Sequence, residues 1–187
     1  IDWVDADGTL VNGPEGYAYV TISYKDASKT EKYFSADGSP FLTAGGYYGR
    51  IVTLGNRGRL AEVTYLNENG GWMLCGAGYA RVKITYTMKG QETAVNFYNE
   101  NNRLVLVPSL GYASMECDYR GTTLTKRTYL DADKNPVDIP AGYAIMVQKV
   151  TKENKITSIE YQHADGTPAT CEEGWSICRR DLDSKGR

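Results

Sequence analysis

Residues 79–86 read Tyr79-Ala80-Arg81-Val82-Lys83-Ile84-Thr85-Tyr86, a run in which apolar and polar side chains alternate. Val82 and Ile84 lie on the apolar face of this run. Tyr79 and Lys83 lie on the opposite, polar face. Alternation with a period of two over such a length predicts a β-strand with one buried face.

The chain returns in a second alternating run after a short polar turn. The turn at 55–58 leads into residues 60–66, and the turn at 152–155 leads into residues 156–161. Two alternating runs joined by a short turn rich in Gly and Asn predict a β-hairpin.

This hairpin pattern recurs about every 32 residues along the chain. A Gly-aromatic pair marks each repeat, and its aromatic members are Tyr17, Tyr47, Tyr79, Tyr112, Tyr143 and Trp175. A second aromatic column runs in step with the first: Trp3, Tyr33, Tyr65, Phe97, Tyr129 and Tyr161. Self-similarity at this period is typical of one supersecondary unit stacked on its neighbours.

The sequence therefore predicts an all-β protein made of six tandem β-hairpin repeats in a single array over residues 1–187. The expected units are approximately 1–32, 33–64, 65–96, 97–128, 129–160 and 161–187. About twelve successive strands exceed what a flat open sheet usually carries, so we expect an elongated, coiled antiparallel sheet or a solenoid. A closed six-unit ring, similar to a propeller, is the alternative.

The two chain ends fall out of phase with the repeat. Residues 1–4 correspond to the end of a second strand, and residues 182–187 are expected to stop in the turn before the sixth second strand. We therefore expect six first strands, five complete second strands and a partial one at the start. The sequence begins at Ile1 without Met or a signal peptide, which indicates a processed or trimmed product.

Turns of the Asp-x-Asp-Gly type join successive hairpins, for example at 5–8 and 35–38. Asp and Asn side chains bind the local backbone in such turns, and a final Gly tolerates positive φ. A calcium-binding EF-hand loop also needs a Glu at its twelfth position, where counting from Asp5 gives Gly16. The pattern predicts turns rather than a metal site, and no cofactor is expected.

Composition and charge exclude several classes of partner. The formal net charge is −2 with mixed signs throughout, so we expect no nucleic-acid binding and no polybasic membrane patch. No apolar run approaches the roughly 20 residues that a membrane-spanning helix needs, so membrane insertion is not expected.

The four cysteines are Cys75, Cys117, Cys171 and Cys178, and none forms a Cys-x-x-Cys pair. His163 is too distant in sequence to complete a zinc pattern with them. We expect the four cysteines to behave as small, buried apolar residues. Disulfides between 171 and 178 or between 75 and 117 are the alternative, and they imply an oxidising compartment.

No set of catalytic residues interrupts the repeat. The sequence has no Gly-x-Ser-x-Gly elbow, no phosphate-binding loop and no zinc-hydrolase helix. The single histidine, His163, occupies a turn position held elsewhere by Asp, Asn or Ser, and we expect a surface turn residue there. The sequence therefore predicts a protein that is not an enzyme.

The Gly-aromatic column is the candidate ligand-binding site, and its members are Tyr17, Tyr47, Tyr79, Tyr112, Tyr143 and Trp175. We expect them on the polar strand face, opposite the face of Ala, Val and Ile. Exposed rings at even spacing can dock sugar rings or choline-like cations. Packing of each ring on the preceding glycine is the alternative. The second column is expected to stack between hairpins and to fix their register.

Residues 32–38, Lys-Tyr-Phe-Ser-Ala-Asp-Gly, and residues 129–133, Tyr-Leu-Asp-Ala-Asp, resemble two related groups of bacterial surface repeats. One group comprises the Tyr-Asp (RHS-like) and MORN-like β-hairpin repeats of secreted and cell-surface proteins. The other comprises the cell-wall/choline-binding and clostridial-toxin repeats, whose units read Tyr-Phe-x-x-Asp-Gly followed by Gly-Trp or Gly-Tyr. The resemblance implies an extracellular or envelope location and a scaffold or adhesive role.

Together these observations favour a bacterial surface or secreted repeat array that acts as a spacer or binding platform. A glycan- or cell-wall-binding module is one alternative, with a glycan, a cell-wall polymer or another surface protein as partner. A self-assembling filament or surface-layer subunit is another, because the ends of an open array expose strands that invite pairing.

Overall fold

The computed structural model describes residues 1–181 and is all-β, with no α-helix in that range. Its strands are β1 (Tyr19–Lys25), β2 (Ser28–Phe34), β3 (Gly49–Leu54), β4 (Leu60–Leu66), β5 (Arg81–Tyr86), β6 (Glu92–Tyr98), β7 (Ser114–Arg120), β8 (Thr123–Leu130), β9 (Ile145–Val150), β10 (Ile156–Gln162) and β11 (Ile177–Arg179). A short 3-10 turn, η1 (Asn56–Gly58), lies between β3 and β4. The predicted all-β hairpin architecture is confirmed.

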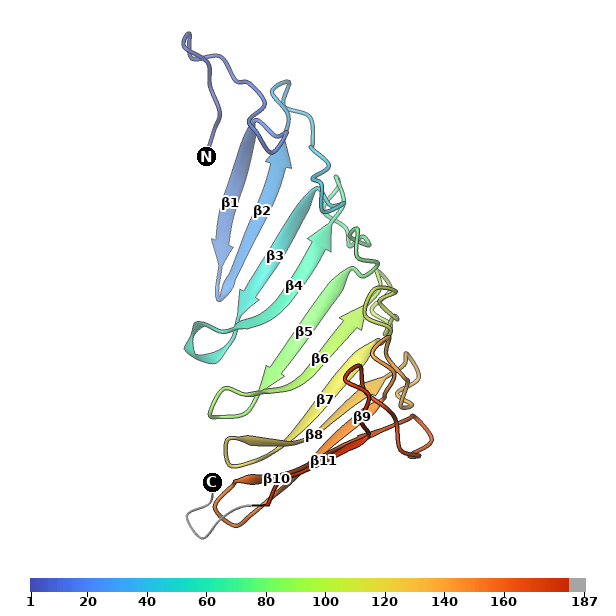
Figure 1. Cartoon of the computed structure of the whole chain (residues 1–187). Helices are drawn as coiled ribbons and strands as arrows, with labels where there is room; N and C mark the ends of the chain where they lie inside the picture. Colours follow the sequence, from blue (N-terminus) through green and yellow to red (C-terminus); the bar gives the residue numbers. More distant parts are fainter. Residues whose placement is uncertain (182–187) are drawn as a thin grey trace. The chain divides into compact units, whose positions relative to one another are not determined.

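The strands pair in chain order, from β1 to β11, in one antiparallel sheet. Figure 1 shows the strands following one another as hairpins. Within residues 1–181 no pairing joins β1 to β11, so the sheet is open. The alternative of a closed, propeller-like ring is therefore wrong: the strand order has two ends, and nothing in the described part of the chain links them.

The chain divides into two compact parts. The first comprises residues 1–84 with 97–103, and the second comprises residues 85–96 with the chain from Leu104 onward. Each part consists of consecutive antiparallel pairs. No helix within residues 1–181 is long and apolar enough to cross a membrane.

The second strand of each hairpin is the element that the sequence predicts best. Strand β4 covers Leu60–Leu66, and β10 covers Ile156–Gln162, one residue beyond the expected end. First strands begin later than expected, since β5 begins at Arg81 rather than Tyr79. The carbonyl of Tyr79 accepts a hydrogen bond from the amide of Cys75 at 2.9 Å, which keeps Tyr79 in the preceding turn.

The turns between hairpins are closed by Asp and Asn side chains, as predicted. The Oδ1 atom of Asp5 accepts hydrogen bonds from the amides two and four residues later, at 3.0 and 2.9 Å. Asn67, Asn99 and Asp131 make the same pair of bonds. These side chains therefore close the turns through hydrogen bonds to the local backbone.

The N-terminal segment occupies the place of a second strand, as predicted. The amide of Trp3 donates to the carbonyl of Ala18 at 2.8 Å. The amide of Tyr65 donates in the same way to the carbonyl of Ala80 at 2.8 Å. Strand β11 lies where the sequence predicts the last of the first strands, and the expected final turn at 182–187 lies outside the described residues.

The apolar strand face is buried in both parts near the start of the first strands. In the first part, Ala18, Val20, Ala80 and Val82 are buried, whereas Lys83 is exposed. In the second part, buried Met115, Cys117 and Tyr129 form a cluster, and these partly buried residues pack against it: Val95, Tyr112, Tyr119, Leu124, Ile139 and Tyr143. The predicted core face is therefore confirmed at these positions but not along whole strands, because Ile22 and Tyr24 on the same face of β1 are 41% and 77% exposed.

The cysteines are all free. Cys75, Cys117 and Cys171 are buried, as expected of small apolar residues, and Cys178 is half-buried. The alternative of disulfides at 171–178 or 75–117 is not what the structure contains.

Candidate ligand-binding sites

The first member of the Gly-aromatic column lies on the apolar side of the sheet. Val20 on β1 is directly opposite Tyr33 on β2, so their side chains share one face. The Tyr17 ring packs edge-on against the Tyr33 ring, with 5.2 Å between centroids. The expectation that Tyr17 faces the polar side is therefore wrong. Tyr17 precedes β1 in a turn, where strand alternation does not fix the direction of a side chain.

The two aromatic columns interleave in a ladder within each part. In the first part the centroid distances are 5.2 Å for Tyr17–Tyr33, 6.1 Å for Tyr33–Tyr47, 4.7 Å for Tyr47–Tyr65, 5.7 Å for Tyr65–Tyr79 and 4.8 Å for Tyr79–Phe97. In the second part they are 4.9 Å for Tyr112–Tyr129, 6.0 Å for Tyr129–Tyr143, 4.5 Å for Tyr143–Tyr161 and 5.2 Å for Tyr161–Trp175. Such tilted and edge-on contacts stabilise by about 0.5–1.5 kcal/mol each beyond area burial. We call this arrangement the aromatic ladder.

The ladder borders a cleft in the first part, at one end of the ladder. This aromatic cleft has a volume of about 360 Å³ and is lined by Pro14, Glu15, Tyr17, Tyr33, Thr43, Ala44, Gly45 and Tyr47. It brings Tyr17 and Tyr47 of the predicted site together with Tyr33 of the second column. The other predicted members, Tyr79, Tyr112, Tyr143 and Trp175, are half-buried in the ladder.

A buried carboxylate lies beside the aromatic cleft. Glu31 is 6% exposed, and its Oε2 atom accepts hydrogen bonds from the Tyr33 hydroxyl at 3.2 Å and Arg50 Nε at 2.5 Å. Its Oε1 atom lies 2.6 Å from Lys29 Nζ. Burial raises the pKa of Glu31, but the bonds from Lys29 and Arg50 outweigh it and leave that pKa below its ordinary value.

The same surroundings hold the neighbouring tyrosine neutral. Burial raises the pKa of Tyr33 to about 12, with the Glu31 carboxylate adding to the rise. At neutral pH the network therefore contains an ionised Glu31, a protonated Tyr33 and two cations. Sequence reasoning missed this network. Its signal is the charge of Glu31 and Arg50 at repeat positions where most units carry apolar residues.

The second part has a charged residue at the position that corresponds to Glu31. Arg127 precedes Tyr129 by two residues, as Glu31 precedes Tyr33. On β8 it is directly opposite Cys117 of β7 and Met146 of β9. Burial lowers the pKa of Arg127. The interactions with Cys117 and Tyr129 raise that pKa by more than burial lowers it, so the net shift is upward.

Cations on the polar face of the sheet are held by the protein itself. In the first part, Arg81 pairs with Glu62 at 2.6 Å, donates to Asn102 at 2.9 Å and lies 5.4 Å from the ring centre of Trp72. These contacts use its charge within the fold. Arg81 is therefore a structural residue rather than a free docking group.

Lys134 has the corresponding role in the second part. It occupies a turn position with φ of 68°, where several other turns place Gly. Its Nζ atom reaches Asn96 Oδ1 at 3.0 Å, Ser114 Oγ at 2.8 Å and Glu116 Oε1 at 3.1 Å. The turn is thereby tied down onto the strands.

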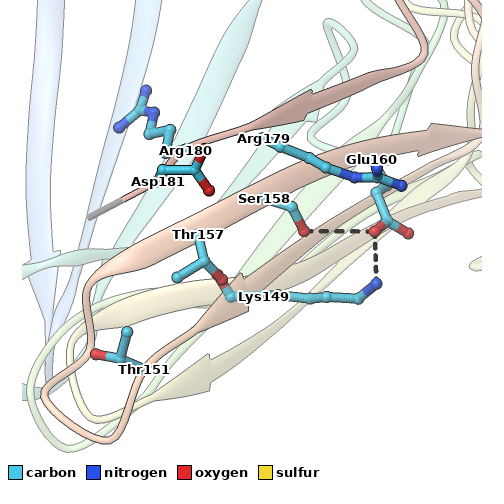
Figure 2. A pocket seen from close by; sticks show the side chains of 8 residues that line it. All are labelled: Lys149, Thr151, Thr157, Ser158, Glu160, Arg179, Arg180 and Asp181. Atoms are coloured by element: carbon cyan, nitrogen blue, oxygen red, sulfur yellow. Dashed lines mark hydrogen bonds and ion pairs between the residues drawn. The ribbon is translucent and has the colours of Figure 1, made fainter. Parts of the chain in front are cut away.

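A polar cleft lies on the last three strands of the second part. It has a volume of about 490 Å³ and is lined by Lys149, Thr151, Thr157, Ser158, Glu160, Arg179, Arg180 and Asp181. Figure 2 shows Lys149 and Ser158 both directed at the Glu160 carboxylate, at 2.6 and 3.4 Å. The Lys149 bond lowers the pKa of Glu160. The cleft combines three cationic side chains, Lys149, Arg179 and Arg180, with two carboxylates, of which Glu160 is paired with Lys149.

His163 is a turn residue whose imidazole ring contacts the carboxylate of Asp138. Its Nδ1 atom lies 2.7 Å from Asp138 Oδ2, and Asp138 Oδ1 accepts the amide of Ala164 at 2.8 Å. Asp138 therefore ties this turn to the preceding loop.

Groups able to hold a metal ion were not found: no set of three or more His, Cys, Asp or Glu side chains comes together within residues 1–181. Comparison of the chain with protein-family models finds no match, and no curated protein matches it either. Function is therefore inferred from the residues of the chain itself.

Proposed function

We propose that this chain is a non-enzymatic β-repeat scaffold of an extracellular or cell-surface bacterial protein, and that it serves as a binding platform. Its six units of about 32 residues form an elongated, coiled antiparallel sheet or solenoid. The observation that carries the proposal is the aromatic ladder, in which successive hairpins contribute the same two rings in the same order. Because each unit brings the rings that contact its neighbours, another unit can be added to the array through the same kind of contact.

Small-angle scattering tests the proposed architecture. A compact domain of this length has a radius of gyration of roughly 16 Å. An elongated array gives a clearly larger value, and a value near that of a compact domain contradicts the proposal. The location follows from the resemblance to surface repeats. Antibody labelling of intact and permeabilised cells tests it, since a surface protein is labelled equally in both.

Saccharide binding in the aromatic cleft is a second candidate function. Tyr17, Tyr33 and Tyr47 border one cavity together with the polar side chains of Glu15 and Thr43. Rings with polar neighbours suit a sugar, which presents C–H groups to an aromatic face and hydroxyls to hydrogen-bonding groups.

Titration with neutral cell-wall oligosaccharides tests this candidate. The variant Tyr17→Ala removes one wall of the cleft at the end of the ladder, and we expect it to abolish binding. The matched control is Tyr79→Ala, which alters the same column outside the cleft and leaves binding intact. Equal affinities for the two variants would show that the cleft is not the binding site.

A further inference from the structure

Arg127 is a half-buried cation without a carboxylate partner. Among the ion pairs formed within residues 1–181, none includes Arg127. Cys117 lies directly opposite it on β7, Tyr129 follows two residues later on β8, and these two side chains raise its pKa. Its Nε atom is buried and makes no hydrogen bond with any described residue.

Removing a charge from water without a counter-charge is unfavourable, and a thiol and a phenol compensate a guanidinium less well than a carboxylate does. The first part shows what a compensated arrangement looks like. Glu31 lies directly opposite Arg50 and forms an ion pair with it. Arg127 instead lies opposite Met146, whose thioether carries no charge.

The surroundings of Arg127 are aromatic. The Tyr129 ring lies between those of Tyr112 and Tyr143, with centroids 4.9 and 6.0 Å away. Tyr119 packs against the same cluster and is half-buried, as is Arg127 itself. Arg127 and the rings of Tyr112, Tyr119 and Tyr143 are therefore each partly exposed, whereas Tyr129 is buried.

We propose that Arg127 and its flanking tyrosines form a subsite for a carboxylate-bearing saccharide of the uronic acid class. A planar guanidinium matches a carboxylate in shape and charge, and tyrosine rings pack against the C–H face of a pyranose ring. The charge of Arg127 opposes a choline-like cation at this part of the ladder. The inference rests on the proposed binding role and adds the class of ligand.

The test is an NMR titration of the whole chain with glucuronate and, at matched ionic strength, with glucose. We expect saturable chemical-shift changes at residues of β7, β8 and β9 with glucuronate and none with glucose. Shifts of equal size with both sugars, or none with glucuronate, overturn the proposal.

Three variants locate the site. Arg127→Met removes the cation at similar length, and Met146→Glu supplies an internal carboxylate opposite Arg127. We expect each to weaken glucuronate binding about tenfold or more. The matched control is Arg81→Met, which removes a cation paired with Glu62 outside the aromatic cleft and leaves the affinity unchanged. Undiminished glucuronate binding by Arg127→Met overturns the proposal. If Met146→Glu does not fold, the result for Arg127→Met alone decides.

Failure of this inference is distinguishable from failure of the binding role. If neutral oligosaccharides bind the aromatic cleft at Tyr17 while glucuronate does not bind near Arg127, the uronic acid subsite alone is refuted. If neither binds, the binding role is refuted as well.

Discussion

Glu31 and Arg127 occupy the same place in two hairpins, two residues before a ladder tyrosine, and their surroundings differ in one decisive respect. Glu31 is buried and has three donors within hydrogen-bonding distance, from Lys29, Tyr33 and Arg50. Arg127 is half-buried and takes part in none of the ion pairs among the described residues. We call the first a closed network, because its charges are paired within the fold, and the second an open one, because its charge has no ion-pair partner among the described residues.

The residue on the neighbouring strand accounts for the difference. Strand β3 places Arg50 opposite Glu31, whereas β9 places Met146 opposite Arg127. The backbone register is alike in the two hairpins, so the repeat preserves geometry while its cross-strand neighbours set the chemistry. A repeat protein can therefore carry a structural ion pair at one hairpin and an available charge at another.

The largest expected effect concerns the ladder, on which both regions depend. Tyr129 is 7% exposed and contacts Tyr112 and Tyr143. We expect Tyr129→Ala to lower the free energy of unfolding by about 3–5 kcal/mol, as for other large aromatic residues truncated in a core. Urea denaturation followed by far-UV circular dichroism measures this loss. A loss below about 1 kcal/mol would show that the ladder contributes little to stability.

The next effect sharpens the comparison at Glu31. Glu31→Gln keeps the shape of the side chain but leaves Arg50 and Lys29 without their counter-charge. We expect a loss of about 2–3 kcal/mol, less than for a fully buried pair because both cations are 36% exposed. The control Glu116→Gln breaks the more exposed pair with Lys134 and is expected to cost about 0.5 kcal/mol or less. Equal losses would place the Glu31 network among ordinary surface pairs.

The pH dependence of stability isolates the charge of Glu31. The folded-state pKa of Glu31 lies below its ordinary value of 4.5, so the unfolded state binds protons more readily. The stabilisation is therefore fully present above about pH 4.5 and is lost as pH falls through the folded-state pKa. We expect the gap between the wild type and Glu31→Gln, measured by urea denaturation, to narrow between pH 7 and pH 3. A constant gap would contradict the assignment.

The fold was predictable because two independent periods in the sequence agree. Alternation within residues 60–66 and 156–161 predicts strands, and the period of about 32 residues places each strand after an equivalent turn. Strand starts were less predictable. Tyr79 continues the alternating pattern, yet its carbonyl closes a turn with Cys75, and hydrogen bonding outweighs the pattern there.

The candidate site was predictable in its residues but not in their arrangement. The sequence identifies both aromatic columns, but merging Tyr17 and Tyr33 into one ladder requires the path of the turn before β1. The Glu31 network also depends on which residue lies opposite on the next strand. A signal was present: the residues two before the second aromatic column are Ile1, Glu31, Val63, Val95, Arg127 and Ile159, of which two are charged.

The smallest expected effect is at Arg127 and separates the two regions most directly. Arg127→Met removes a half-buried charge that has no carboxylate to leave behind, and the thiol of Cys117 and the hydroxyl of Tyr129 lose one charged partner. Replacing a poorly compensated charge by an apolar side chain of similar length is often neutral or stabilising. We expect a change within about 1 kcal/mol in urea denaturation, against a loss of about 2–3 kcal/mol for Glu31→Gln. A loss at Arg127 as large as at Glu31 would mean that the guanidinium is a structural partner of Cys117 and Tyr129, and the contrast between a closed and an open network would fail.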